Sequence, residues 1–124
     1  SMNVHPEYYT RLVRRRVTGQ PALTPTEQQE LDLHLYICAR CAFEYATLLQ
    51  PRHPKVAEAL RRDLEKRLTA DMVTPHLWDL AWTLYRDEPL DDFQTMIWRF
   101  LEHDSEALGR LRLLEAQVWL QTGD

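Results

Sequence analysis

Residues 23–41 read LTPTEQQELDLHLYICARC, and this stretch gives the clearest indication of the fold. Thr24 is followed by Pro25, and Glu27 stands three residues after Thr24, as in a helix that begins with a capping box and has proline in its first turn. The sequence therefore predicts a helix that begins after Thr24. Its apolar stripe continues at helical spacing through Leu31, Leu35, Cys38, Ala42, Tyr45 and Leu49.

The composition extends this prediction to the whole chain. The 124 residues include 20 Leu but only 8 Val and Ile together, and glycine occurs 3 times. Unbranched side chains keep most of their freedom in a helix, whereas β-branched side chains favour strands. We expect an all-α protein, a small bundle of about six helices. These helices are expected to begin near Pro6, Thr24, Pro54, Thr74, Phe93 and Asp104.

The two halves of the chain differ in charge and in aromatic content. Residues 1–70 carry a net charge of +3 and residues 71–124 carry −7, which gives −4 in all. All 4 tryptophans belong to the second half. We expect residues 1–70 and 71–124 to be two regions with different roles, either as separate domains or within one continuous bundle.

Charge and hydropathy argue against two classes of partner. A net charge of −4 makes the chain a poor match for DNA, so we expect no direct nucleic-acid binding. The longest apolar run, residues 35–39, is far too short for a bilayer span. The first residues contain no basic segment followed by an apolar stretch, and we expect a cytoplasmic protein. A solvated helix face is the preferred interpretation of the basic cluster formed by Arg11, Arg14, Arg15 and Arg16.

The cysteines of the chain stand together in the string H-x3-C-x2-C, formed by His34, Cys38 and Cys41. Two thiolates and an imidazole are ligands that Zn²⁺ prefers, and a structural zinc site has four ligands. We expect His5 to be the fourth ligand, because it precedes a helix that must pack against the helix after Thr24. A zinc ion held by these four residues would have no open position and would join the N-terminal three helices.

Helix geometry separates this interpretation from a simpler one. On a straight helix His34 and Cys41 differ by about 10 Å in height, too far for one zinc ion to reach both. A metal site therefore predicts a break or bend between Tyr36 and Ala42. The alternative is one unbroken helix, in which His34 is satisfied in the core and both cysteines act as small apolar side chains.

Other chemistry for these residues has less support. A c-type haem site needs a histidine directly after the second cysteine, where this chain has Ala42. A thioredoxin-like pair needs a βαβ setting, and a stabilising disulfide is rare in the cytosol. The sequence contains no Ser-His-Asp arrangement and no glycine-rich phosphate loop, so we expect that the protein is not an enzyme. A metal-dependent enzyme would need an open metal position, with His5 outside the ligand set.

The stretch from Leu23 to Cys41 resembles the zinc-finger domain of bacterial anti-sigma factors. That family has a short N-terminal helix, a helix start similar to residues 23–27, and then a His-Leu-x-x-Cys-x-x-Cys string similar to residues 34–41. The resemblance covers about residues 5–50. It implies a structural zinc ion, a fourth ligand near the N-terminus at the position of His5, and a sigma factor as the partner.

Two functions follow from these observations. The first is a regulator of anti-sigma type that sequesters a sigma factor, with the acidic residues 71–124 covering a basic surface of that partner. The second is a zinc-stabilised helical adaptor or dimerisation module without connection to sigma factors, in which the tryptophan-rich half packs against a second copy or another protein.

Overall fold

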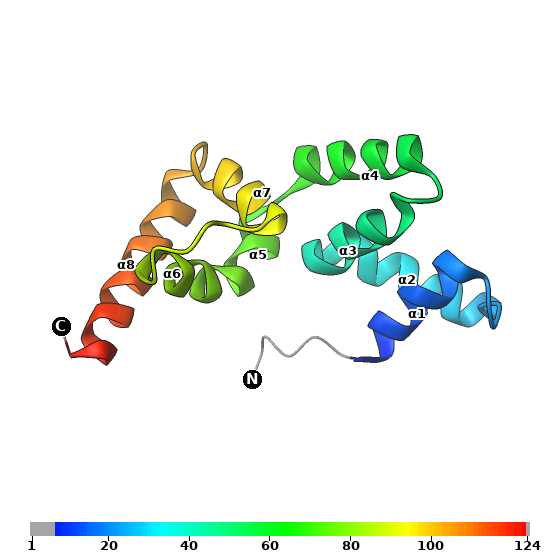
Figure 1. Ribbon diagram of the computed structural model, residues 1–124, viewed down its shortest axis with the longest axis horizontal. Coiled ribbons are helices and arrows are strands. Elements are labelled where there is room, and N and C mark those ends of the chain that lie inside the picture. Colours follow the sequence, from blue (N-terminus) through cyan, green and yellow to red (C-terminus); the bar gives the residue numbers. More distant parts are fainter. Residues whose placement is uncertain (1–6, 124) are drawn as a thin grey trace. The chain divides into compact units, whose positions relative to one another are not determined.

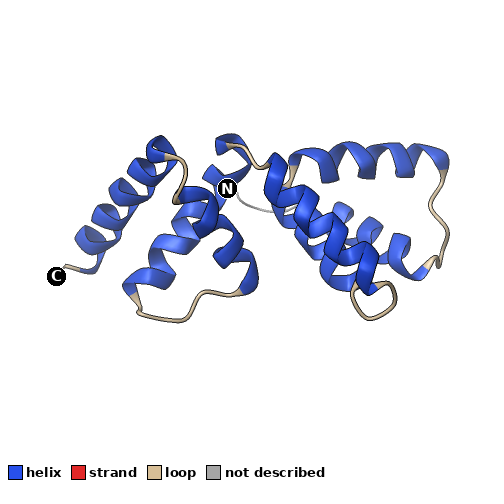
Figure 2. Ribbon diagram, turned by 90° about the horizontal axis from the view of Figure 1, so that it is seen from above, coloured by secondary structure: helices blue, strands red, loops and turns tan. Residues whose placement is uncertain are grey.

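The computed structural model describes residues 7–123, and all regular structure within them is helical (Figure 2). The helices are α1 (Glu7–Thr18), α2 (Pro25–Ile37), α3 (Ala39–Leu49), α4 (Pro54–Arg67), α5 (Ala70–Val73), the 3-10 helix η1 (Thr74–His76), α6 (Leu77–Tyr85), α7 (Asp92–Leu101) and α8 (Ser105–Thr122). The all-α class is thus confirmed. The expected number of about six helices is too low, because the second helix is interrupted at Cys38 and because α5 precedes Thr74.

The chain divides into two compact units (Figure 1). The first, called the N-terminal unit, ends at Arg67 and contains α1–α4. The second, called the C-terminal unit, begins at Leu68 and contains α5–α8. The side chain of Thr69 accepts a hydrogen bond from the Met72 amide and caps α5, so a new helix starts directly after the first unit ends.

The predicted capping box at the start of α2 is confirmed. The Thr24 hydroxyl accepts from the Glu27 amide at 3.2 Å, and the Glu27 carboxylate accepts from the Thr24 amide at 2.9 Å. The same carboxylate accepts two hydrogen bonds, of 2.9 and 3.0 Å, from the Arg15 guanidinium of α1. This guanidinium, together with the Thr24 amide, lowers the pKa of Glu27 to about 2. One carboxylate therefore begins α2 and fastens α1 to it.

The core of the N-terminal unit contains a fully buried cluster of Leu12 and Val13 from α1, Leu31 from α2 and Cys41 from α3. Partly buried apolar side chains, among them Tyr9 and Leu35, pack against this cluster.

The basic cluster of α1 is a solvated face only in part. Arg11 and Arg14 are exposed as expected, whereas Arg15 and Arg16 are half-buried against α2, where Arg16 pairs with Asp32 at 2.8 Å.

α4 covers α3 with a face that differs in part from the one its sequence predicts. Val56, Leu60, Leu64 and Leu68 stand four residues apart, which predicts one core stripe. Leu64 is buried as expected and Ala57 beside the stripe is buried too, whereas Val56 is 52% exposed. The guanidinium of Arg61 lies 4.6 Å from the ring centroid of Phe43 and donates to the Thr47 hydroxyl at 3.0 Å. The long side chain of Arg61 therefore packs along α3.

The C-terminal unit is built around α6, α7 and α8. Leu80, Ile97 and Leu111, one from each helix, are almost completely buried. Tyr85 of α6 meets Trp119 of α8 edge to face, with ring centroids 5.0 Å apart. The predicted helix start at Thr74 is in fact η1, after which the α-helix continues from Leu77.

Candidate metal centre

Three potential ligands meet where α2 ends and α3 begins. His34 is in the last turn of α2, Cys38 lies between the helices, and Cys41 is in the first turn of α3. One ligand atom from each residue lies within 4.8 Å of the other two. Zinc bonds of about 2.0–2.3 Å can join two donors that are about 4 Å apart, so a shift of about 1 Å brings all three to one ion. These residues can hold a metal ion.

The bend that brings the ligands together is located at Cys38. Its backbone is extended, with φ −106° and ψ 105°, so α2 cannot continue into α3. The helical hydrogen bonds stop at the bond from the Cys38 amide to the His34 carbonyl, and they resume from the Ala42 amide to the Cys38 carbonyl. The break predicted between Tyr36 and Ala42 is therefore confirmed, and the unbroken helix of the alternative interpretation is wrong.

The two cysteine side chains lie close together, and one of them is buried. Cys41 is completely buried, and its amide donates to the Cys38 sulfur at 3.4 Å. The hydrogen bond between the two thiols raises the pKa of Cys41, and its burial raises this pKa further. Two thiolates this close repel each other in an apolar setting, and a divalent cation between them removes that cost.

The ring of His34 is held by a neighbour from α1. Tyr9 stacks on it with ring centroids 3.8 Å apart and an angle of 3° between the planes. A ligand whose ring is already oriented loses less freedom when a metal binds. The spacing of Tyr9, Leu12 and Val13 predicts only an apolar stripe on the first helix. No spacing in the sequence connects Tyr9 to His34, which is 25 positions later.

A second neighbour of the site comes from the end of α4. Arg67 donates hydrogen bonds to the carbonyl oxygens of Leu35 and Tyr36, two of the three residues between the first two ligands. Sequence reasoning missed Arg67, because an arginine in the last turn of a helix is ordinary and its partners are more than 30 residues away. Only the packing of α4 against this end of α2 reveals the contact.

The predicted fourth ligand, His5, lies outside the described residues. Within residues 7–123, the group of potential ligands has three members. A metal ion bound there needs a further donor, which a residue of the N-terminal segment or a solvent molecule can supply.

Among the described residues, none of the helices combines the length and the apolar character that a membrane span requires.

The site is assigned from its own geometry alone. The chain matches no known family model, no curated protein and no solved structure.

Proposed function

We propose that this chain is a zinc-binding regulatory protein of anti-sigma type that acts in the cytoplasm and has no enzymatic activity. In this proposal His5, His34, Cys38 and Cys41 hold one structural zinc ion, and the protein sequesters a sigma factor by direct contact. The observation that carries the proposal is the meeting of three ligand atoms within 4.8 Å across the bend at Cys38.

The donor set supports zinc over other metals. Two thiolates and one imidazole suit a borderline-soft ion in tetrahedral geometry, whereas calcium and magnesium prefer oxygen ligands. The buried position of Cys41 supports a structural role, because a structural ion joins helices and does not need access for a substrate. The ion would stabilise the contact of α2 with α3 and with α1.

The sequence supports His5 as the fourth ligand. It stands two residues before Glu7, where α1 begins, and α1 carries Tyr9. Tyr9 itself stacks on the ligand His34. A His5→Ala variant distinguishes a zinc ion with four protein ligands from one with three protein ligands and an open position. It should bind zinc at least tenfold more weakly if His5 is a ligand. Unchanged zinc affinity would instead support a metal site with an open position, and with it the hypothesis of a metal-dependent enzyme.

Exposed apolar side chains beside the site support a protein partner. Leu33, Tyr36 and Ile37 are 71%, 69% and 66% exposed at the end of α2. Large apolar side chains gathered on one helix turn are typical of a surface that another protein covers. The charge of −7 on residues 71–124 suits a basic surface on the same partner and would speed association.

A binding experiment tests the anti-sigma proposal. The zinc-loaded protein should bind one or more sigma factors of the source organism in isothermal titration, and Leu33→Asp should weaken this binding at least tenfold. Val56→Asp is the matched control, because Val56 is also an exposed apolar residue but lies on α4. Absence of binding to every sigma factor of that organism would refute the anti-sigma function but would not affect the evidence for the metal centre.

A zinc-stabilised dimerisation module is the second candidate, and α8 supports it. Leu113, Trp119 and Leu120 of this helix are 68%, 52% and 80% exposed. A second copy of the chain could cover them in a symmetric contact. A dimer in sedimentation that dissociates on Leu120→Glu would favour this candidate. A monomer at all concentrations up to the millimolar range would contradict it.

A further inference from the structure

We propose that Arg67 is a positioning residue of the metal centre, whose guanidinium holds open the bend that gathers the ligands. The inference rests on the proposed metal site and names a residue, 26 positions after Cys41, that controls its geometry. It follows from the hydrogen bonds at the end of α2, from the contacts that fix the arginine, and from the position of both relative to the ligands.

The bend at Cys38 leaves two carbonyl groups of α2 in need of donors. In a continuous helix the amides of Ala39 and Arg40 would donate to the carbonyls of Leu35 and Tyr36. Because the backbone of Cys38 is extended, those amides no longer point at these two carbonyls. Arg67 supplies the replacement: Nη2 donates to the Leu35 oxygen at 3.0 Å, and Nη1 donates to the Tyr36 oxygen at 2.6 Å.

The arginine is itself held in place. Its guanidinium lies 5.2 Å from the ring centroid of Tyr36, and its Nε donates to the Asp63 carboxylate at 3.3 Å. The side chain of Arg67 is 27% exposed, so the carbonyl contacts are shielded in part from water. A planar fork with two parallel N–H groups fits two neighbouring carbonyls, and its positive charge suits the C-terminal end of a helix.

The two carbonyls lie between ligands. Leu35 directly follows His34, and Tyr36 stands two residues before Cys38. Without Arg67 these carbonyls regain their donors when Cys38 turns back into a helical conformation, which would move Cys41 away from His34 along the helix axis. Arg67 therefore favours the bent backbone before any metal binds, and its loss should weaken metal affinity without changing the ligands.

Metal titration of three variants tests this role. Zinc affinity is measured by competition with a chromophoric chelator, and the ligand set is read from the visible absorption of the Co²⁺-loaded protein. Arg67→Ala should bind zinc about 10- to 100-fold more weakly than the wild type, with an unchanged Co²⁺ spectrum at saturation. Arg67→Lys should be intermediate, because an ammonium group cannot donate to both carbonyls in the same geometry.

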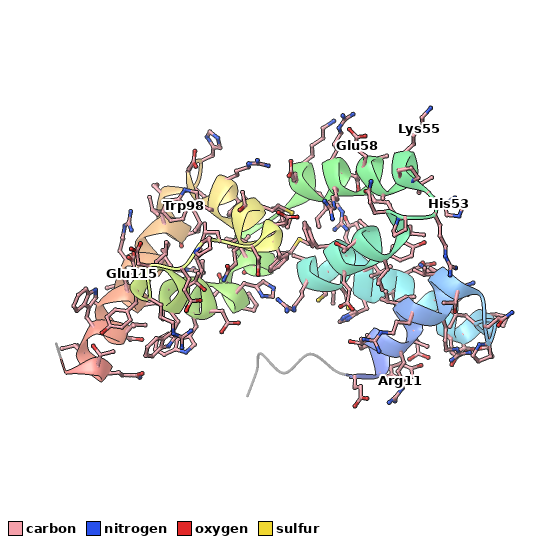
Figure 3. The ribbon with its side chains drawn as sticks, viewed as in Figure 1. Arg11, His53, Lys55, Glu58, Trp98 and Glu115 are labelled. Carbon is pink, nitrogen blue, oxygen red and sulfur yellow. The ribbon has the colours of Figure 1, made fainter. Side chains whose placement is uncertain are left out.

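Arg62→Ala is the matched control. Arg62 is also on α4, but it is exposed and pairs with Glu58, which points away from α3 (Figure 3). Its zinc affinity should equal that of the wild type.

Zinc affinity of Arg67→Ala within twofold of the wild type would overturn the inference and leave the metal centre intact. If Arg67→Ala does not fold at saturating zinc, the zinc affinity of Arg67→Lys is the test instead. An affinity of Arg67→Lys equal to that of the wild type would then overturn the inference. Absence of metal binding by the wild type would overturn the metal centre and this inference together.

Discussion

Removal of zinc should unfold the N-terminal unit and leave the C-terminal unit folded. The buried cluster of the N-terminal unit contains Leu12, Val13, Leu31 and Cys41, and Cys41 is itself a proposed ligand. A unit of about 60 residues is marginally stable, and in the N-terminal unit loss of the metal would also disturb the core to which its ligand Cys41 belongs. Zinc binding contributes about 10–16 kcal/mol in zinc-finger peptides at neutral pH, which matches or exceeds the ~5–15 kcal/mol by which whole domains are stable.

The lengths of the helices give the expected loss of helical signal on chelation. α1 to α4 contain 12, 13, 11 and 14 residues, and the long helices of the C-terminal unit, α6 to α8, contain 9, 10 and 18. Chelation should therefore remove about half of the helical circular dichroism at 222 nm. All 4 tryptophans are in the C-terminal unit, so their fluorescence should not change.

Both signals are recorded on one sample during titration with a strong chelator under reducing conditions, and zinc is then added back. A Cys38→Ser, Cys41→Ser double variant is the control, since it should already lack the N-terminal signal and should not respond to the chelator. A full helical signal after the metal has been shown to leave would refute the stabilising role of zinc. A shift of tryptophan fluorescence in parallel with the helical signal would refute the independence of the two units.

Three further predictions concern single side chains. Tyr9→Leu removes the ring stacked on His34 and should weaken zinc affinity about threefold to tenfold in a chelator competition assay, since such stacking is worth about 0.5–1.5 kcal/mol; unchanged affinity would show that the stack does not orient the ligand. Glu27→Gln should lower the urea midpoint of the N-terminal unit by the same amount at pH 7 and pH 5.5. With a pKa of about 2 in the folded state against an ordinary 4.5, Glu27 stabilises fully above pH 4.5, and this stability is lost as pH falls towards 2; a smaller difference already at pH 5.5 would contradict the ion pair with Arg15. Leu111→Ala empties a fully buried position and should lower the free energy of unfolding of the C-terminal unit by about 2–5 kcal/mol, measured by tryptophan fluorescence in urea; an intact metal affinity is expected, and its loss would contradict the division into units.

Local signals predicted the parts of the fold that depend on neighbouring residues. The capping box of Thr24 and Glu27 is a contact between residues three positions apart, and both of its hydrogen bonds are present. The N-cap at Asp104, which begins α8, is another contact of this range. The bend at Cys38 was predicted for a different reason: the reach of one metal ion from His34 to Cys41 is shorter than a straight helix allows.

Contacts between distant segments could not be predicted in the same way. The spacing of α4 indicated Val56 as a core residue, but the way α4 packs on α3 buries Ala57 and places Arg61 against Phe43. The short α5 was missed because its four residues carry no periodic pattern. Arg67 was missed for a related reason, since its role exists only where the end of α4 meets the end of α2.

The metal content of the purified protein tests the central claim most directly. The protein is purified under reducing conditions without added chelator, and its zinc is measured by elemental analysis against protein concentration. We expect one zinc ion per chain in the wild type and none in the Cys38→Ser, Cys41→Ser double variant. A wild-type protein that contains no zinc and takes up none when zinc is added would contradict the metal centre, and with it the function proposed for this chain.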